Sequence, residues 1–194
     1  MKTLLTSLVL SLLSIASWAS EEVAMVDVPI EEQVVQSIEF AGKPGAKAQA
    51  ALIKMDDSAE ISVLITHQYA QDSRHFVAVD NSKLGIYATE IAGNETVLSV
   101  NGAGSLEINQ QNSALGRDRW ERTITVAYRN GKYVLAGFTF SYRDTLNPAS
   151  TGHCDYNLMS GRGLFNGKKV QLKTKNIDFE SLEDSEKLYS CQGW

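Results

Sequence analysis

The stretch WERTITVAYRNGKYVLAGFTFSY, residues 120–142, decides the fold class of this chain. Ile124, Val126 and Tyr128 alternate with more polar residues, a period of two that is typical of a β-strand with one buried face. Asn130-Gly131 follows, and this dipeptide adopts the positive φ angles of a tight hairpin turn at little cost. A second alternating run leaves the turn, and the side chains predicted to share one side of it are Val134, Ala136, Phe138, Phe140 and Tyr142. The stretch therefore predicts an antiparallel hairpin.

Shorter runs of the same kind occupy most of the chain around this hairpin. Ile61, Val63 and Ile65 predict another strand, and Asn166-Gly167 predicts a second tight turn. Further apolar runs are separated by turn signals, among them residues 80–82 (Asp-Asn-Ser). Short strands at a spacing of about 8–12 residues predict a mainly β, antiparallel fold, as a barrel, a sandwich or a partial propeller, with one or two short helices.

Three segments stay open between alternatives at this point. Residues 31–40 fit either a short helix or a first strand. Residues 48–55 are rich in alanine, which favours a helix, yet they are short and lie next to a predicted strand. The acidic tail, residues 177–188, fits a helix or an irregular segment.

The N-terminus has the pattern of a secretory signal peptide, residues 1–19. Lys2 is the only charged residue before Glu21, an apolar stretch follows from Leu4 to Ala16, and Ser17-Trp18-Ala19 places small residues at a cleavage site. The apolar stretch is too short for a membrane-spanning helix, which needs about 20 residues. We expect a periplasmic or secreted protein, with an N-terminal lead-in at residues 20–45 and a single β-rich domain at residues 46–194.

The chain has two cysteines, Cys154 and Cys191. An even number of cysteines in an exported protein favours a disulfide, and we predict that this one ties the C-terminus to the strand around Asp155. A reactive thiol would need a neighbouring base. His153 precedes Cys154, but adjacent residues of a strand point to opposite faces of a sheet, so we do not expect the two to cooperate.

Charge and motifs exclude several functions. The formal net charge is −5, and an acidic surface repels phosphate, so we expect no nucleic-acid partner and no membrane insertion after signal cleavage. The sequence contains neither a nucleophile elbow nor a phosphate-binding loop with its lysine. His67 and His75 flank a predicted turn, but no third ligand accompanies them, so we predict no metal and no cofactor.

The densest cluster of chemically versatile side chains is residues 117–122, RDRWER. Arginine presents a planar fork that suits carboxylate or phosphate, and tryptophan stacks on cations or sugar rings. One hypothesis is therefore a binding site for an anionic or saccharide group, made of Arg117, Arg119, Trp120 and Arg122. The alternative is structural: Trp120 packs in the core and the charges pair across strands.

Residues 117–142, together with DYNLMSG at residues 155–161, resemble a pattern in uncharacterised exported bacterial proteins. In that pattern an Arg-Trp pair opens a strand, an aromatic hairpin follows, and an Asn-Leu-x-x-Gly turn comes next. The resemblance covers about 45 residues near the C-terminus. It implies an envelope location and a β-rich fold, and it implies no activity and no catalytic residues.

Without a catalytic motif, the first functional hypothesis is a non-enzymatic binding module of the bacterial envelope, acting on an unidentified protein or an envelope glycan. The second is an envelope hydrolase that cleaves glycan or peptide through carboxylates or His153. A small acidic exported protein also fits an inhibitor or immunity protein for a basic envelope enzyme. A deep pocket with converging polar groups favours the enzyme, and a flat or convex aromatic surface favours partner binding.

Overall fold

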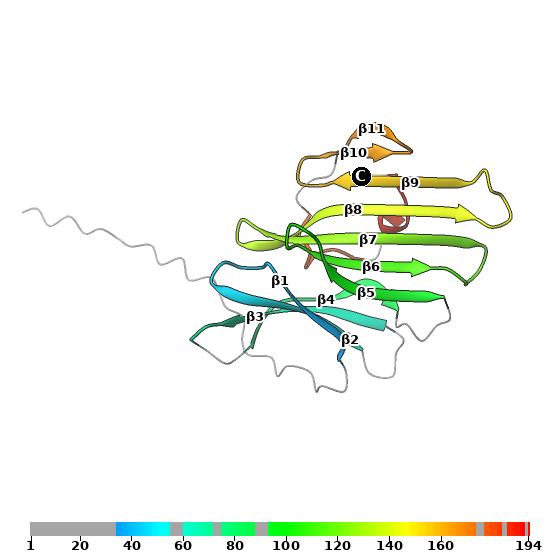
Figure 1. Ribbon diagram of the computed structural model, residues 1–194. Coiled ribbons are helices and arrows are strands. Elements are labelled where there is room, and N and C mark those ends of the chain that lie inside the picture. The colour runs from blue at the N-terminus through cyan, green and yellow to red at the C-terminus, as the bar shows by residue number, and fades with distance from the viewer. Residues whose placement is uncertain are drawn as a thin grey trace, which may run out of the picture.

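The computed structural model describes residues 34–54, 60–71, 75–87, 93–173, 177–183, 186–192 and 194. Within these residues the chain forms two antiparallel β-sheets, together with a short 3₁₀ helix, η2 (Glu186–Tyr189) (Figure 1). The predicted antiparallel, mainly β fold is confirmed. The predicted signal peptide, residues 1–19, lies outside the described residues. In the described part of the chain, no helix has the length and apolar character needed to cross a membrane.

Consecutive strands are neighbours throughout both sheets. Sheet A has the order β1-β2-β3-β4, with the bounds β1 Val34–Phe40, β2 Ala46–Lys54, β3 Glu60–Tyr69 and β4 His75–Tyr87. Sheet B has the order β11-β10-β9-β8-β7-β6-β5, with the bounds β5 Asn94–Val100, β6 Leu106–Asn112, β7 Asp118–Arg129, β8 Lys132–Asp144, β9 Thr151–Asn157, β10 Arg162–Phe165 and β11 Lys168–Gln171. Both sheets are therefore meanders, which hairpin turns can connect.

The structure decides two of the open segments in favour of strands. Residues 34–40 form β1, and the alanine-rich segment forms β2, with which β1 pairs. Ala48 and Ala50 face the core and are almost fully buried, so packing against the opposite sheet overrides their helical propensity. Strand β1 lies within the segment that the sequence sets apart as a lead-in, and it forms an edge of sheet A.

The turn predicted at residues 80–82 is wrong. Strand β4 continues through it, with a shift in register against β3. Asn81 is only 1% exposed, and its side-chain amide donates hydrogen bonds to the carbonyls of Phe179 (2.6 Å) and Leu182 (3.0 Å). The asparagine therefore holds the C-terminal segment by a long-range contact rather than forming a local turn.

The predicted hairpin is confirmed, but the predicted facing of its second strand is wrong in the first half. Asn130 and Gly131 have φ angles of 51° and 88°. Thr125 pairs with Gly137 and Val126 with Leu135, so Ala136 is the extra residue of a β-bulge. A one-residue shift moves side chains to the other face. The core residues of β8 are consequently Tyr133, Leu135, Phe138 and Phe140.

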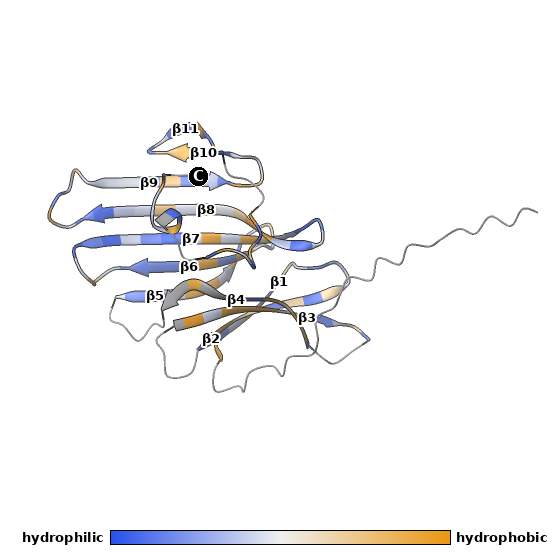
Figure 2. Ribbon diagram, turned by 180° about the vertical axis from the view of Figure 1, so that it is seen from behind, coloured by the Kyte–Doolittle hydropathy of each residue, from blue (hydrophilic) through white to orange (hydrophobic). Residues whose placement is uncertain are grey.

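One face of sheet B, called the inner face, is covered by sheet A and by the C-terminal segment, whose described residues are 177–183, 186–192 and 194 (Figure 2). Phe138 lies on this face, is 1% exposed, and stacks on Trp194 with ring centroids 4.6 Å apart. The segment also pairs with β8, because the Leu135 amide donates to the Ile177 carbonyl and the Phe179 amide to the Tyr133 carbonyl. The tail predicted as helical or irregular is mainly irregular, with η2 near its end.

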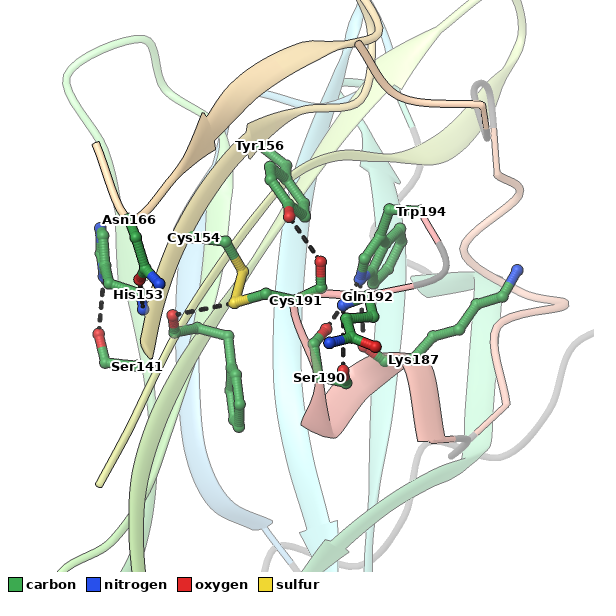
Figure 3. The surroundings of a disulfide bond; sticks show 11 residues. Ser141, His153, Cys154, Tyr156, Asn166, Lys187, Ser190, Cys191, Gln192 and Trp194 are labelled. Atoms are coloured by element: carbon green, nitrogen blue, oxygen red, sulfur yellow. Dashed lines mark hydrogen bonds between the residues drawn. A yellow bond between two sulfur atoms is a disulfide. The ribbon is translucent and has the colours of Figure 1, made fainter. Parts of the chain in front are cut away.

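The predicted disulfide, Cys154–Cys191, is confirmed, with the two Cα atoms 5.7 Å apart (Figure 3). It joins β9 to the C-terminal segment. The Tyr156 hydroxyl donates a 2.6 Å hydrogen bond to the Cys191 carbonyl, and the Trp194 indole donates to the carbonyls of Lys187 and Ser190. These contacts hold the segment against the inner face of sheet B.

Candidate functional site

Strand alternation divides the cluster at residues 117–122 between two surfaces. Trp120 and Arg122 belong to the inner face of sheet B, whereas Arg119 faces the opposite side, called the outer face. Arg117 lies just before β7 and is exposed. The four residues predicted as one binding site therefore do not form a single patch.

Arg122 is a core residue, only 2% exposed. Its guanidinium donates hydrogen bonds to Gln110 Oε1 (2.6 Å), the Leu188 carbonyl (3.1 Å) and the Leu84 carbonyl (3.4 Å). It also lies 4.3 Å from the ring centroid of Tyr189. These partners come from sheet B, sheet A and the C-terminal segment, so Arg122 links all three. The prediction that it contacts a ligand is corrected, because a buried guanidinium is not available at the surface.

Trp120 and Arg117 also follow the structural alternative. Trp120 is half-buried and packs edge-on against Tyr189, with ring centroids 5.3 Å apart. Arg117 Nε donates a 2.7 Å hydrogen bond to Asp144 Oδ2. The other carboxylate oxygen of Asp144 accepts hydrogen bonds from the backbone amides of Leu146 and Asn147. The hydrogen bond from Arg117 is the main cause that lowers the pKa of Asp144 to about 2. Burial acts in the opposite direction, and the two backbone amides lower the pKa further.

The two histidines of the β3–β4 hairpin do not approach each other. His67 is buried and shares a 2.6 Å hydrogen bond with the Tyr133 hydroxyl. His67 pairs with Phe76, and His75 pairs with Gln68, so the two imidazoles face opposite sides of sheet A. Among the described residues, no group of three or more His, Cys, Asp or Glu side chains could hold a metal ion.

The outer face of sheet B is an open, largely polar surface. In β9 exposed and buried residues alternate strictly, so that His153 faces outward and Cys154 inward, as predicted. Two large apolar side chains of the described strands, Val97 and Leu164, are exposed on this face. Most of the other positions carry hydroxyl, amide or charged groups, except near the β7–β8 turn, where Ala127 and Val134 are buried.

One row of this face runs across five strands, from β5 to β9. Its members are direct register partners, each with the next, and we call them the polar row: Glu95, Gln111, Glu121, Ser141 and His153. All five line an open hollow of about 380 Å³. Neighbouring strands are about 4.8 Å apart, so the row spans about 19 Å. This length suits an extended ligand of several units.

Hydrogen bonds fix part of the polar row in place. Gln111 Nε2 donates to Glu95 Oε2 (2.7 Å), and Ser141 Oγ lies 2.8 Å from His153 Nδ1 (Figure 3). In the next row the Thr123 hydroxyl donates to Asn109 Oδ1 (2.9 Å). Within the described part of the chain, the Glu121 carboxylate makes no hydrogen bond or ion pair. The centre of the row therefore offers the carboxylate oxygens of Glu121 to a ligand, and the side chains on both sides of it are held by hydrogen bonds.

A second hollow, of about 580 Å³, continues the first toward the end of the sheet. The two hollows share Gln111, Glu121, Ser141 and His153, and the second is also lined by Arg119 and Arg143. Of the residues predicted for binding, Arg119 is the one whose side chain faces this site. Trp120 and Arg122 also border the hollows, but strand alternation assigns their side chains to the inner face.

Sequence reasoning missed most of this site. Glu95, Gln111, Ser141 and Arg143 carry no recognisable motif, and His153 entered only as a residue of the hydrolase hypothesis. The available signal was a run of polar residues at every second position of predicted strands. Which of them become neighbours depends on strand register, which the sequence leaves open.

Comparison of the chain with known protein families, with curated proteins and with solved structures found no significant match.

Proposed function

We propose that this protein is an exported, non-enzymatic binding module of the bacterial envelope, and that the outer face of sheet B binds a glycan. The observation that carries the proposal is the polar row, in which carboxylate, amide, hydroxyl and imidazole groups line one continuous hollow. Sugars present a similar mixture of donors and acceptors. Export is inferred from the N-terminal pattern, and the disulfide fits an oxidising compartment.

The composition of the hollow supports a hydrophilic ligand over an apolar one. Pockets for small molecules are usually lined predominantly by hydrophobic and aromatic side chains, with a few polar groups that fix the orientation of the ligand. Here the lining residues are polar apart from Val97, and the aromatic side chains of β7 and β8 pack on the inner face. The hydrogen bonds within the row also reduce the entropy lost when a ligand orders these side chains.

Calorimetric titration of the mature protein with solubilised peptidoglycan fragments and with chitotetraose tests the proposal. We expect at least one saccharide to bind and Glu121→Gln to weaken that binding about tenfold, the usual loss for a hydrogen bond to a charged group. Glu39→Gln is the matched control, because it removes the same charge from an exposed position in sheet A. Equal affinities for wild type and Glu121→Gln, or no binding of any saccharide, would contradict the proposal.

An envelope hydrolase is the second candidate, and the contact between Ser141 Oγ and His153 Nδ1 favours it. A nucleophilic serine needs an adjacent base, and that base is ordinarily oriented by a third group. In the described part of the chain, His153 Nε2 has no such partner. Because a serine–histidine pair cleaves amide bonds by acyl transfer, release of free amines from peptidoglycan, lost in Ser141→Ala, would establish this activity in place of simple binding.

A further inference from the structure

Two arginines face each other across the β7–β8 pair at one end of the outer face. Arg119 and Arg143 are direct register partners, and both line the second hollow. Like charges directly opposite one another in an antiparallel pair destabilise a sheet. Within the described residues no carboxylate forms an ion pair with either guanidinium. The fold thus holds two uncompensated positive charges together, although the protein as a whole has a net charge of −5.

Local contacts fix one of the two guanidinium groups. Arg119 Nη1 donates hydrogen bonds to the carbonyls of Leu115 (3.1 Å) and Gly116 (2.7 Å). This leaves the remaining N–H donors of Arg119 for another acceptor. Arg143 is exposed at the neighbouring position of β8, with Thr151 of β9 beside it. Both arginines therefore border the same hollow from neighbouring strands.

We infer that Arg119 and Arg143 form an anion subsite at the end of the glycan-binding face, and that the ligand is an acidic glycan carrying a carboxylate or phosphate group. The planar N–H fork of arginine matches both of these anions. This inference rests on the proposed function for the saccharide part of the ligand. The anion subsite itself is argued from the arginine pair alone.

The arrangement also sets the direction of the ligand along the sheet. Glu121 follows Arg119 by two residues on the same face of β7, so its carboxylate lies about 7 Å further along the strand. An anionic group is attracted to the arginines and repelled by Glu121. The acidic group therefore occupies the arginine end, and the hydroxyl groups of the sugar lie toward Glu121 and Ser141.

The test compares trigalacturonate with its fully methyl-esterified form, and phosphorylated maltotriose with maltotriose itself. Titrations follow binding by calorimetry and by the side-chain ¹⁵N–¹H signals of arginine. We expect each acidic saccharide to bind about tenfold more tightly than its neutral counterpart. Arg143→Gln and Arg119→Gln should remove this preference. Arg129→Gln, which takes the same charge from the far end of β7, should keep it. The stronger of the two acidic probes distinguishes carboxylate from phosphate as the preferred group.

The outcomes separate the two claims. If acidic and neutral saccharides bind equally well, and the arginine variants match wild type, the anion subsite is refuted while the glycan-binding face stands. If no saccharide binds but inorganic phosphate shifts the Arg119 and Arg143 signals, the subsite is supported and the proposed function fails. If no saccharide binds and phosphate does not shift these signals, both fail.

Discussion

The two faces of sheet B are built by the same strands but differ in polarity and in exposure to solvent. The inner face is apolar, is covered by sheet A and the C-terminal segment, and is fastened by a disulfide. The outer face is polar, open and hollowed, and its side chains bond to each other rather than to a covering layer. In β9 successive side chains point alternately to the outer and the inner face.

The residues that stabilise the core and those of the proposed binding surface thus alternate along one sequence. A substitution on the inner face removes packing contacts, whereas its neighbour in the chain can alter the binding surface with little effect on folding.

The largest difference is expected between Phe138 and Thr139, which are adjacent in β8. Phe138→Ala leaves a cavity beneath Trp194 and should lower the free energy of unfolding by about 3–5 kcal/mol. Thr139→Ala changes an outer-face hydroxyl and should stay within about 0.5 kcal/mol of wild type. Urea denaturation of both variants measures the difference. Comparable losses for the two would show that the faces are not energetically distinct.

Removal of the disulfide should have the next largest effect. The bond closes a loop with a sequence separation of 37 residues, which in the chain-entropy model corresponds to about 4 kcal/mol, and measured values are typically about 2–4 kcal/mol. The double variant Cys154→Ser and Cys191→Ser should therefore unfold at lower denaturant than the oxidised protein. Because the bond lies on the inner side of sheet B, away from the outer face, the affinity of the double variant for a saccharide should not change while it stays folded. A selective loss of binding would contradict the separation of the faces.

Arg122 and Arg119 lie three residues apart in β7 on opposite faces. Arg122→Gln removes donors from the Leu188 and Leu84 carbonyls and should destabilise the protein by about 2 kcal/mol. Arg119→Gln should leave the melting temperature nearly unchanged and reduce only the preference for acidic saccharides. Differential scanning calorimetry of both variants makes the comparison. Destabilisation by Arg119→Gln equal to that of Arg122→Gln would show that Arg119 is also a structural residue.

The smallest effect on stability is expected when acid protonates Asp144. The folded-state pKa of Asp144 is lowered from 3.8 to about 2, so the contact with Arg117 contributes stability above the unfolded value and loses it as pH falls toward 2. Asp144→Asn should therefore show a shallower loss of stability between pH 4 and pH 2 than wild type. Thermal melts across this range measure the slopes. Identical slopes would mean that the contact does not contribute.

The hairpin, the β-rich fold class and the disulfide could be predicted because each depends on local signals. Asn130-Gly131 and Asn166-Gly167 define tight turns by their own backbone preferences, and a pair of cysteines leaves a single pairing. Prediction failed where distant contacts decide the outcome. In the sequence Asn81 resembles a turn residue, but in the structure its side-chain amide donates hydrogen bonds to the carbonyls of Phe179 and Leu182.

The candidate site shows the same limit more sharply. The sequence singled out Arg119 because it belongs to a dense local cluster, and it overlooked Arg143, which is separated from Arg119 by the whole hairpin. It also grouped Arg119 with Arg122 in one site, although the alternation of side chains along a strand, which the sequence itself predicts here, places the two on opposite faces. The partner of each side chain is fixed by register, which the bulge at Ala136 shifts by one residue.

The sequence by itself determined that this chain forms antiparallel strands, where two of its tight turns lie and which sulfurs bond, because alternation, turn chemistry and cysteine number act over short distances. Only the tertiary structure decided that Glu95, Gln111, Glu121, Ser141 and His153 become neighbours, that Arg122 is buried and that Arg119 meets Arg143. These contacts depend on how strands far apart in the chain align, and that alignment is set by the packing of the whole core.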